Sequence, residues 1–184
     1  MNFNELKEDV LSRAKNCHAC EPEYKRALRA ETREELLQVI ADNIIWAYKE
    51  KMLNTPYMIE HFEDLFPDVG IYTSGHHEIS EGAIILLGSS SANVKTWDSS
   101  SANVKTLDSS SANVETLDSS SANVETLGSS SANVKTLDSS SANVKTWGSS
   151  SIKYELKGDY STIKDLSKLK LFIKRNKLEV IQVD

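Results

Sequence analysis

The sequence predicts an α+β fold: a small N-terminal α-helical domain followed by a parallel β-solenoid of about twenty residues per coil, closed by a C-terminal β cap. Apolar residues recur at helical spacing near the N-terminus, a ten-residue unit then repeats six times, and apolar residues within each unit alternate as in a strand. We therefore expect a helical head at 1–70, a connector at 71–81, solenoid repeats at 82–159 and a cap at 160–184.

Composition places the chain among globular proteins. Its 184 residues are 39% hydrophobic and 26% charged, a balance that supports a buried core and excludes disordered and membrane-spanning classes. The net charge of −6 gives no general reason to bind nucleic acid or an anionic membrane. The start of the chain is acidic and no apolar run of about 18 residues occurs, so we expect a cytoplasmic protein without membrane contact.

Three helices are the clearest in the head. The first has apolar residues at helical spacing: Phe3, Leu6, Val10 and Ala14. Thr32 and Glu35 form a T-x-x-E capping box before a long helix. The apolar stripe of that helix is Leu36, Leu37, Ile40, Ile44, Ile45 and Tyr48. Asn54-Thr55-Pro56 predicts the start of another helix, which Pro67 and Gly70 are expected to end.

The ten-residue unit decides the fold of the second half. From Ser89 the units read SSSANVKTWD, SSSANVKTLD, SSSANVETLD, SSSANVETLG, SSSANVKTLD and SSSANVKTWG. Serine-rich tracts are often linkers, but a linker does not need Ala92, Val94 and Thr96 at fixed alternate positions. The D-S-S-S or G-S-S-S segment supplies a turn, and we interpret the unit as a solenoid strand and its corner.

Charge predicts how many residues form one coil. With ten residues per coil, three of five neighbouring Lys/Glu pairs would be of like sign. With twenty, every neighbour is of opposite sign, in the columns Lys95-Glu115-Lys135-Glu155 and Lys105-Glu125-Lys145. Opposite charges stabilise adjacent strands, so twenty is favoured. Asp98, Asp118 and Asp138 would then stack, and each is expected to bond turn backbone instead.

The repeat continues beyond its perfect copies. Residues 82–88 align with 92–98, and residues 152–158 align at the far end, which gives eight units in four coils. Residues 160–184 keep a strand pattern that fits either a last coil or a capping hairpin around Arg175-Asn176. A solenoid needs such a cap because an open end is an unpaired β edge.

The segment Ala92-Asn93-Val94-Lys95-Thr96 resembles the A-[D/N]-L-x-x unit of pentapeptide-repeat proteins. That resemblance covers residues 82–158 and implies a right-handed quadrilateral helix. The whole chain, a helical head before near-perfect short repeats, also resembles repeat proteins of gut bacteria and their prophages. Neither resemblance implies an enzymatic activity.

No catalytic, metal or cofactor motif is found in the sequence. Cys17 and Cys20 form C-H-A-C without the second pair of ligands that a zinc site needs or the βαβ context of a redox pair, so we interpret them as structural thiols. Ser74-Gly75-His76-His77-Glu78 is interpreted as a linker rather than an active site. We expect no enzyme, no metal and no cofactor.

The expected function is non-catalytic binding of a macromolecule, with a protein as the partner and nucleic acid not expected. The prophage resemblance suggests an inhibitor of a host defence or regulatory protein. A nucleic-acid mimic and an array-type binder of ice or carbohydrate stay open as alternatives, as does whether the head or the repeats carry the surface. The contact candidates are Trp97 and Trp147, as interface anchors, and Lys174 and Arg175 in the basic C-terminal segment.

Overall fold

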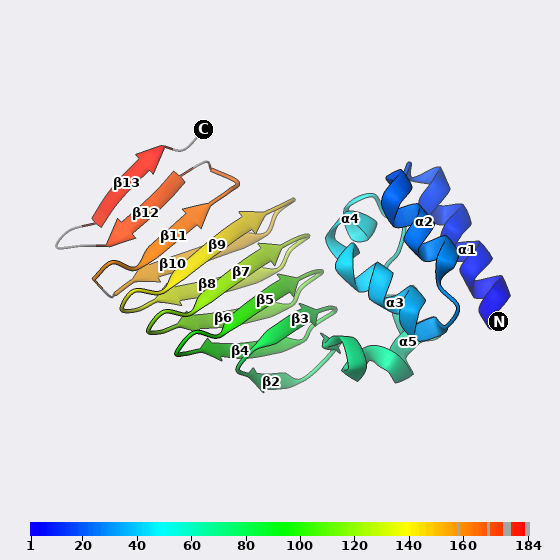
Figure 1. The fold of residues 1–184 in the computed structure, drawn as a ribbon, viewed down its shortest axis with the longest axis horizontal. Helices are drawn as coiled ribbons and strands as arrows, with labels where there is room; N and C mark the ends of the chain where they lie inside the picture. The colour runs from blue at the N-terminus through cyan, green and yellow to red at the C-terminus, as the bar shows by residue number, and fades with distance from the viewer. Residues whose placement is uncertain (158, 169, 175–177, 183–184) are drawn as a thin grey trace. The chain divides into compact units, whose positions relative to one another are not determined.

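The computed structural model describes residues 1–184 apart from 158, 169, 175–177 and 183–184 (Figure 1). The chain divides into two compact units, Met1–Val69 and Gly70–Asp184. The first unit is helical and the second is a parallel β-solenoid with antiparallel strands at its C-terminal end. Each unit is described separately.

The helical unit contains five α-helices and a 3₁₀-helix. They are α1 (Phe3–Asn16), α2 (Glu21–Arg29), α3 (Arg33–Asp42), α4 (Ile44–Lys49), α5 (Thr55–Phe62) and η1 (Glu63–Val69). Side-chain caps start three of them: Asn2, Thr32 and Asn54 each accept a hydrogen bond from the backbone N–H three residues later. Most stripe residues predicted from the sequence are buried in its core, with Leu36, Leu37 and Ile44 fully buried, whereas Phe3 and Tyr48 are half-buried.

Two details of the predicted helices are wrong. The expected long helix is divided at Asn43 into α3 and α4, because the Asn43 side chain donates to Val39 O at 3.0 Å and to Glu23 Oε2 at 2.8 Å. Such local bonds compete with the helical backbone. Pro67 does not end the last helix either, since it lies inside η1. The α2 helix has no counterpart among the three predicted from apolar spacing.

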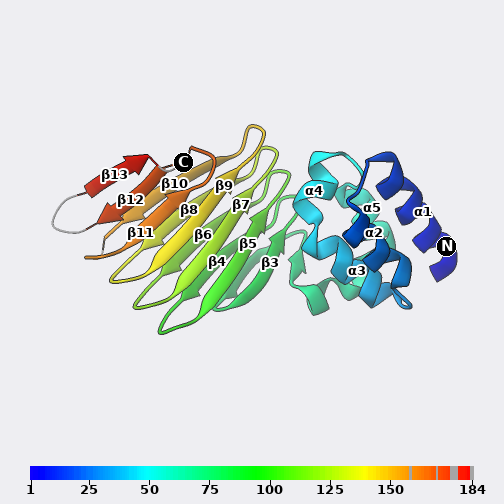
Figure 2. The same cartoon turned by 45° about the horizontal axis from the view of Figure 1, so that its top comes forward.

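The solenoid unit is built from two sheets. One contains β1 (Ile71–Tyr72), β3 (Gly82–Leu86), β5 (Ser101–Thr106), β7 (Ser121–Thr126), β9 (Ser141–Thr146), β11 (Thr162–Asp165), β12 (Lys170–Lys174) and β13 (Leu178–Gln182), in that order. The other contains β2 (His76–Ile79), β4 (Ser91–Thr96), β6 (Ser111–Thr116), β8 (Ser131–Thr136) and β10 (Ser151–Leu156). Successive repeats alternate between the sheets, as Figure 2 shows.

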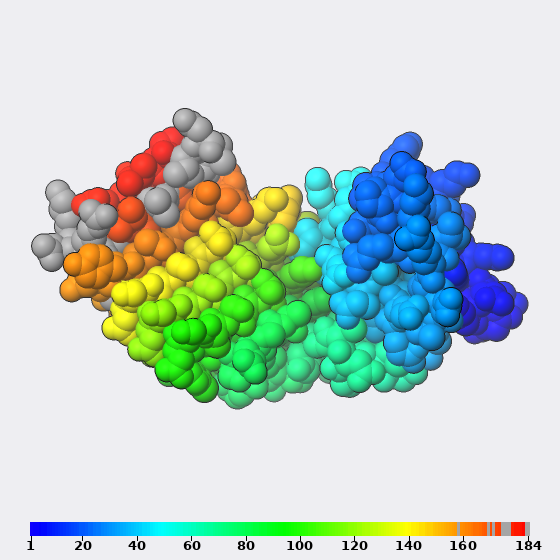
Figure 3. Space-filling model, in the orientation of Figure 1, coloured from blue at the N-terminus to red at the C-terminus, as the bar shows by residue number. Residues whose placement is uncertain are grey.

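The register confirms twenty residues per coil and about four coils. Lys95 pairs with Glu115 and Glu115 with Lys135 between parallel strands, and Lys105, Glu125 and Lys145 pair in the same way on the other sheet. Each Lys/Glu column therefore alternates in sign, as predicted. Figure 3 shows the strands as neighbouring bands of side chains.

The interior contains a hydrogen-bonded ladder as well as an apolar core. Ala and Val of every perfect repeat are buried, and so is Thr in all repeats but the last. The middle serine of the turn points inward too: Ser120 Oγ accepts from Leu117 N–H at 2.9 Å and donates to Thr96 O at 3.1 Å. Thr96 Oγ1 lies 3.0 Å from Ser120 Oγ, 24 residues later. The middle serines thus tie each coil to the next, beyond the turn role expected of them.

Among the stacked corner aspartates, Asp118 bonds to backbone of the preceding coil, whereas a bond to backbone of its own turn was expected. Asp98, Asp108, Asp118 and Asp138 all have positive φ, between 52° and 58°. Asp118 Oδ2 accepts from Asp98 N–H at 3.3 Å, in the preceding coil. A left-handed corner explains why only Asp or Gly occurs there, since Asp tolerates this conformation better than most residues.

The two ends of the solenoid differ from its middle. Residues 71–81, expected as a connector, carry β1 and β2, which pair in parallel with β3 and β4. At the far end β12 pairs antiparallel with β11 and with β13, which is the hairpin alternative. Tyr154 packs on Phe172 there, with ring centroids 4.7 Å apart. The cap thus covers the last coil of the core.

Candidate binding face of the solenoid

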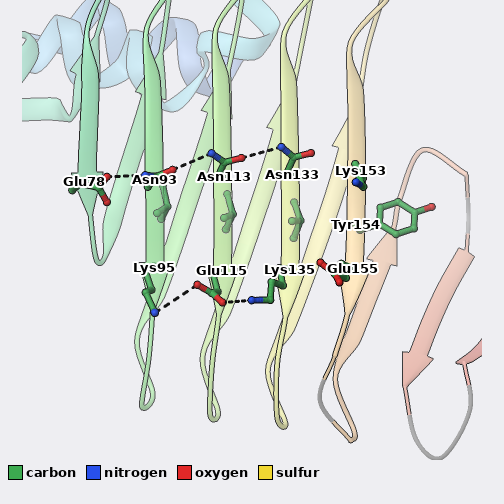
Figure 4. A pocket seen from close by; sticks show the side chains of 13 residues that line it. Glu78, Asn93, Lys95, Asn113, Glu115, Asn133, Lys135, Lys153, Tyr154 and Glu155 are labelled. Carbon is green, nitrogen blue, oxygen red and sulfur yellow. Dashed lines mark hydrogen bonds and ion pairs between the residues drawn. The ribbon is translucent and has the colours of Figure 1, made fainter.

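The outer face of the five-stranded sheet presents rows of polar side chains, two of which enclose a trough. Because side chains alternate along a strand, burying Ala, Val and Thr turns Asn and Lys or Glu outward in every repeat. Stacking at twenty residues per coil then aligns like positions across β2, β4, β6, β8 and β10 (Figure 4). The face is therefore a regular array, whose rows run across the strands.

The first row is an asparagine ladder. Asn133 Nδ2 donates to Asn113 Oδ1 at 2.9 Å, and Asn113 Nδ2 donates to Asn93 Oδ1 at 3.0 Å (Figure 4). Asn93 Nδ2 donates in turn to Glu78 Oε1 at 2.7 Å. An amide has two N–H donors and two acceptor lone pairs, so each ladder member keeps some capacity for a ligand.

The second row is the alternating Lys/Glu column. Glu115 lies between Lys135, 2.5 Å from its Oε1, and Lys95, 3.6 Å from its Oε2. Hydrogen bonding to Lys135 lowers the pKa of Glu115, and the same contact raises the pKa of Lys135. The column neutralises itself, so this face has little net field along its length.

A trough of about 510 Å³ runs between the two rows. The strand positions of Val94, Val114 and Val134, whose side chains are buried, also line it. Lys153, Tyr154 and Glu155 line it at β10 (Figure 4). Both walls are polar and lie open to solvent. The trough is suited to a ligand that lies along the solenoid and makes hydrogen bonds to both rows.

The eight-stranded sheet repeats part of this pattern. Asn143 Nδ2 donates to Asn123 Oδ1 at 3.0 Å, and Asn123 Nδ2 donates to Asn103 Oδ1 at 2.9 Å. The second face offers a matched comparison, because the same repeat residues occur there in a different neighbourhood.

A polar cluster ends the asparagine ladder at β2. His76 Nδ1 lies 2.9 Å from Ser91 Oγ, and His76 Nε2 lies 2.9 Å from Glu78 Oε1. The segment interpreted as a linker is thus partly a strand, and it places a hydroxyl, an imidazole and a carboxylate in contact. The His76 and Glu78 side chains are 52% and 71% exposed, and Ser91 is half-buried. Bonds from Asn93 to both His76 and Glu78 make the cluster a continuation of the ladder.

The two tryptophans predicted as contact residues follow strands of different sheets. Trp97 follows β4 and is 47% exposed, whereas Trp147 follows β9 on the other sheet and is half-buried. Lys145 Nζ lies 4.5 Å from the centroid of the Trp147 ring. Lys174 is the last residue of β12, and its side chain lies outside the described part of the chain. Arg175 also lies outside the described residues.

The cysteines lie in the helical unit between α1 and α2. Cys17 is half-buried, with its thiol 3.7 Å from Glu50 O, and Cys20 is exposed at the start of α2. Among the described residues no group of three or more His, Cys, Asp or Glu side chains could hold a metal ion. Within the same residues, no helix is both long and apolar enough to cross a bilayer.

Comparison with protein-family models, curated proteins and solved structures returns no match. The site is therefore interpreted from its geometry. The asparagine ladder is its main feature that the sequence reasoning missed. The sequence signal for it is an asparagine at the same place in every repeat, which shows that these residues stack but not that their side chains bond one another.

Proposed function

We propose that this protein is a non-catalytic macromolecule-binding protein whose solenoid faces form the contact surface. The observation that carries the proposal is the trough between the Asn93-Asn113-Asn133 ladder and the Lys/Glu column. Buried Ser–Thr hydrogen bonds between coils favour a rigid surface, and a rigid surface loses little conformational entropy on binding. The exposure of His76 and Glu78 supports a binding role over catalysis, because catalysis gains most from sites that exclude water.

A protein is the partner we favour. The paired charges of the column leave hydrogen bonding and shape as the basis of recognition, and Trp97 offers an exposed aromatic anchor beside the same sheet. The resemblance to pentapeptide-repeat proteins and to prophage-borne repeat proteins supports a finer proposal. In that proposal the chain is a phage- or mobile-element-encoded inhibitor that blocks a host defence or regulatory protein.

A neutral carbohydrate is the second candidate, and the asparagine ladder favours it. Amides spaced about 4.8 Å apart, one per strand, present a repeating set of donors and acceptors to hydroxyl groups. A nucleic-acid mimic is less well supported, because Lys95 and Lys135 neutralise Glu115. Ice binding through threonine is also disfavoured, since Thr96, Thr116 and Thr136 are fully buried.

The test compares matched variants on the two faces. The immobilised full chain, an Asn113→Leu variant and an Asn123→Leu variant are used to capture proteins from a host lysate and to probe a panel of neutral glycans. Circular dichroism first checks that both variants keep the wild-type spectrum. We expect one partner that the Asn113→Leu variant fails to bind and the Asn123→Leu variant still binds, because Asn113 lines the trough and Asn123 does not.

A partner retained by both variants would contradict the assignment to this trough. A glycan whose retention depends on Asn113, with no such protein, would favour the second candidate. If charge reversal at Glu115 (Glu115→Lys) abolished binding, that result would instead support nucleic-acid mimicry, which depends on acidic side chains.

A further inference from the structure

A second cavity lies entirely within the helical unit. It has a volume of about 330 Å³ and is lined by α1, α2, α3, α4 and the segment between α1 and α2. Its walls are mainly apolar, with Val10, Ala27 and Ile40 among the buried members. Tyr24 and Trp46 line it as half-buried aromatic rings. This volume and this lining are typical of a small-molecule site.

Two polar side chains of the cavity, Glu23 and Asn43, are hydrogen-bonded to each other. Asn43 uses its amide nitrogen on Glu23 Oε2 and Val39 O, and Glu23 Oε2 also accepts from Arg26 at 2.7 Å. None of these three bonds occupies Glu23 Oε1 or Asn43 Oδ1. These two oxygens therefore keep acceptor capacity in a cavity whose walls are mainly apolar.

The local charge is negative in spite of Arg26. That guanidinium binds Glu23 at 2.7 Å and Asp42 at 2.7 Å, so one positive charge is shared between two carboxylates. Hydrogen bonding to Asp42 raises the pKa of Arg26, which keeps it charged. The cavity lining includes neither lysine nor arginine within this fully described unit. His18 and Cys20 complete the polar rim, and both are exposed.

We propose that this cavity binds a small organic cation: an ammonium group carried on an aromatic or branched aliphatic body. The apolar walls accept the body, while Glu23 and the faces of Tyr24 and Trp46 attract the positive charge. An anion would be repelled by the carboxylate, and a neutral molecule would lose the charge attraction. The site is independent of the solenoid face, so either proposal can fail without the other.

The test uses Trp46 as a built-in reporter. The chain has three tryptophans, and replacing Trp97 and Trp147 by Phe leaves Trp46 as the only one. The emission of this full-length variant is titrated with benzylammonium and with benzyl alcohol, a neutral molecule of nearly the same shape. We expect a saturable change with benzylammonium and about tenfold weaker binding of benzyl alcohol. Equal affinities would overturn the assignment to a cation, and no saturable change with either would overturn the site.

Matched variants separate the cavity carboxylate from general surface charge. Glu23→Gln should weaken benzylammonium binding about tenfold and leave benzyl alcohol unchanged. Glu21→Gln is the control on the same helix, because Glu21 binds Lys25 at 2.5 Å and does not line the cavity. Equal effects of the two substitutions would overturn the proposal.

Protection of a thiol gives a second readout. In a Cys17→Ser background Cys20 is the remaining cysteine, and it lines the cavity. Bound benzylammonium should slow alkylation of Cys20 by iodoacetamide in the Glu21→Gln variant and not in Glu23→Gln. Alkylation at the same rate with and without benzylammonium in both variants would contradict binding at this cavity.

Discussion

The buried Ser–Thr ladder has one interruption, and it leads to a sharp prediction. The hydroxyl groups of four repeat threonines, Thr96, Thr106, Thr116 and Thr126, bond to the serine 24 residues later, as Thr116 Oγ1 does with Ser140 Oγ at 3.0 Å. Between Thr136 and β11 the chain has one extra residue, since Thr162 pairs with Ser141 at an offset of 21, so the buried Ser161, 25 residues after Thr136, takes the place that Ser140 has in the preceding coil. Among the described residues, Thr136 Oγ1 is the buried side-chain atom that lacks a hydrogen-bond partner. Thr116 and Thr136 are therefore a matched pair: both are buried at the same repeat position, and only the Thr116 hydroxyl has a hydrogen-bond partner.

Replacing these two threonines by valine should change stability in opposite directions. Valine has nearly the shape of threonine, so the difference comes from the hydroxyl group. At Thr136 the substitution removes a buried unsatisfied hydroxyl, whose burial costs about 1–3 kcal/mol, and should raise the free energy of unfolding by about 1 kcal/mol. At Thr116 it removes the bond to Ser140 and a longer bond to Lys135 O at 3.4 Å, and should lower that free energy by about 1 kcal/mol.

Thermal unfolding of the full chain, followed by circular dichroism in the β-sheet region, measures the difference. For a chain of this size 1 kcal/mol corresponds to about 2–4 °C, so the two variants should differ in Tm by about 4–8 °C. Ser119→Ala, at an exposed serine of the same turn type, should leave Tm almost unchanged. A Thr136→Val variant that is destabilised as much as Thr116→Val would refute the assignment of the ladder and of its interruption.

Three further predictions concern other contacts. Gly128 has φ +79°, and a Cβ there would lie 3.3 Å from Asp108 O. Gly128→Ala should therefore lower Tm. Gly128→Asp should lower Tm less, because Asp occupies the other left-handed corners and tolerates this conformation better than Ala. Lys135 lowers the pKa of Glu115, so the stability that Glu115 adds is present at neutral pH and lost as the pH falls through this lowered pKa. Glu115→Gln should therefore lower Tm by about 1–4 °C at pH 7 and have no effect in acid. An equal loss of Tm at both pH values would contradict the ion pair. Tyr57 is buried, which raises its pKa, and its hydroxyl donates to Asp9 Oδ2 at 2.8 Å. Tyr57→Phe should therefore lower the free energy of unfolding of the helical unit by about 1–3 kcal/mol, measured by urea unfolding. An unchanged unfolding midpoint would show that this hydrogen bond adds no stability.

The sequence predicted the features that depend on periodicity. The Lys/Glu alternation predicted a twenty-residue coil because only that register places Lys95 beside Glu115. The ends of the solenoid were harder, since β2 pairs with β4 at an offset of fifteen residues, from His76 to Ser91. A register that differs from the repeat leaves no periodic signal. The break at Asn43 was missed for a related reason, because apolar spacing continues through it while a single side chain ends the helix.

The binding face was harder to predict than the core because the sequence does not show what a repeated polar residue contacts. The inward positions identify themselves by their apolar side chains, whereas Asn113 and Ser120 are both polar and both occur in every unit. The structure separates them: Ser120 is buried between coils, and Asn113 is exposed in the ladder. Composition alone makes both of them turn or surface residues.

The pattern of variation between the repeats indicates what constrains them. The inward Ala, Val and Thr and the middle Ser are the same in all six perfect units, because strands of both sheets stack in the same register. The Lys/Glu position instead follows the order Lys, Lys, Glu, Glu, Lys, Lys. That order makes sense only if each unit is in contact with the unit two places away. The ten-residue cassette is therefore the unit of sequence, the twenty-residue coil is the unit of packing, and two coils are the smallest insertion or deletion that keeps opposite charges paired in both columns.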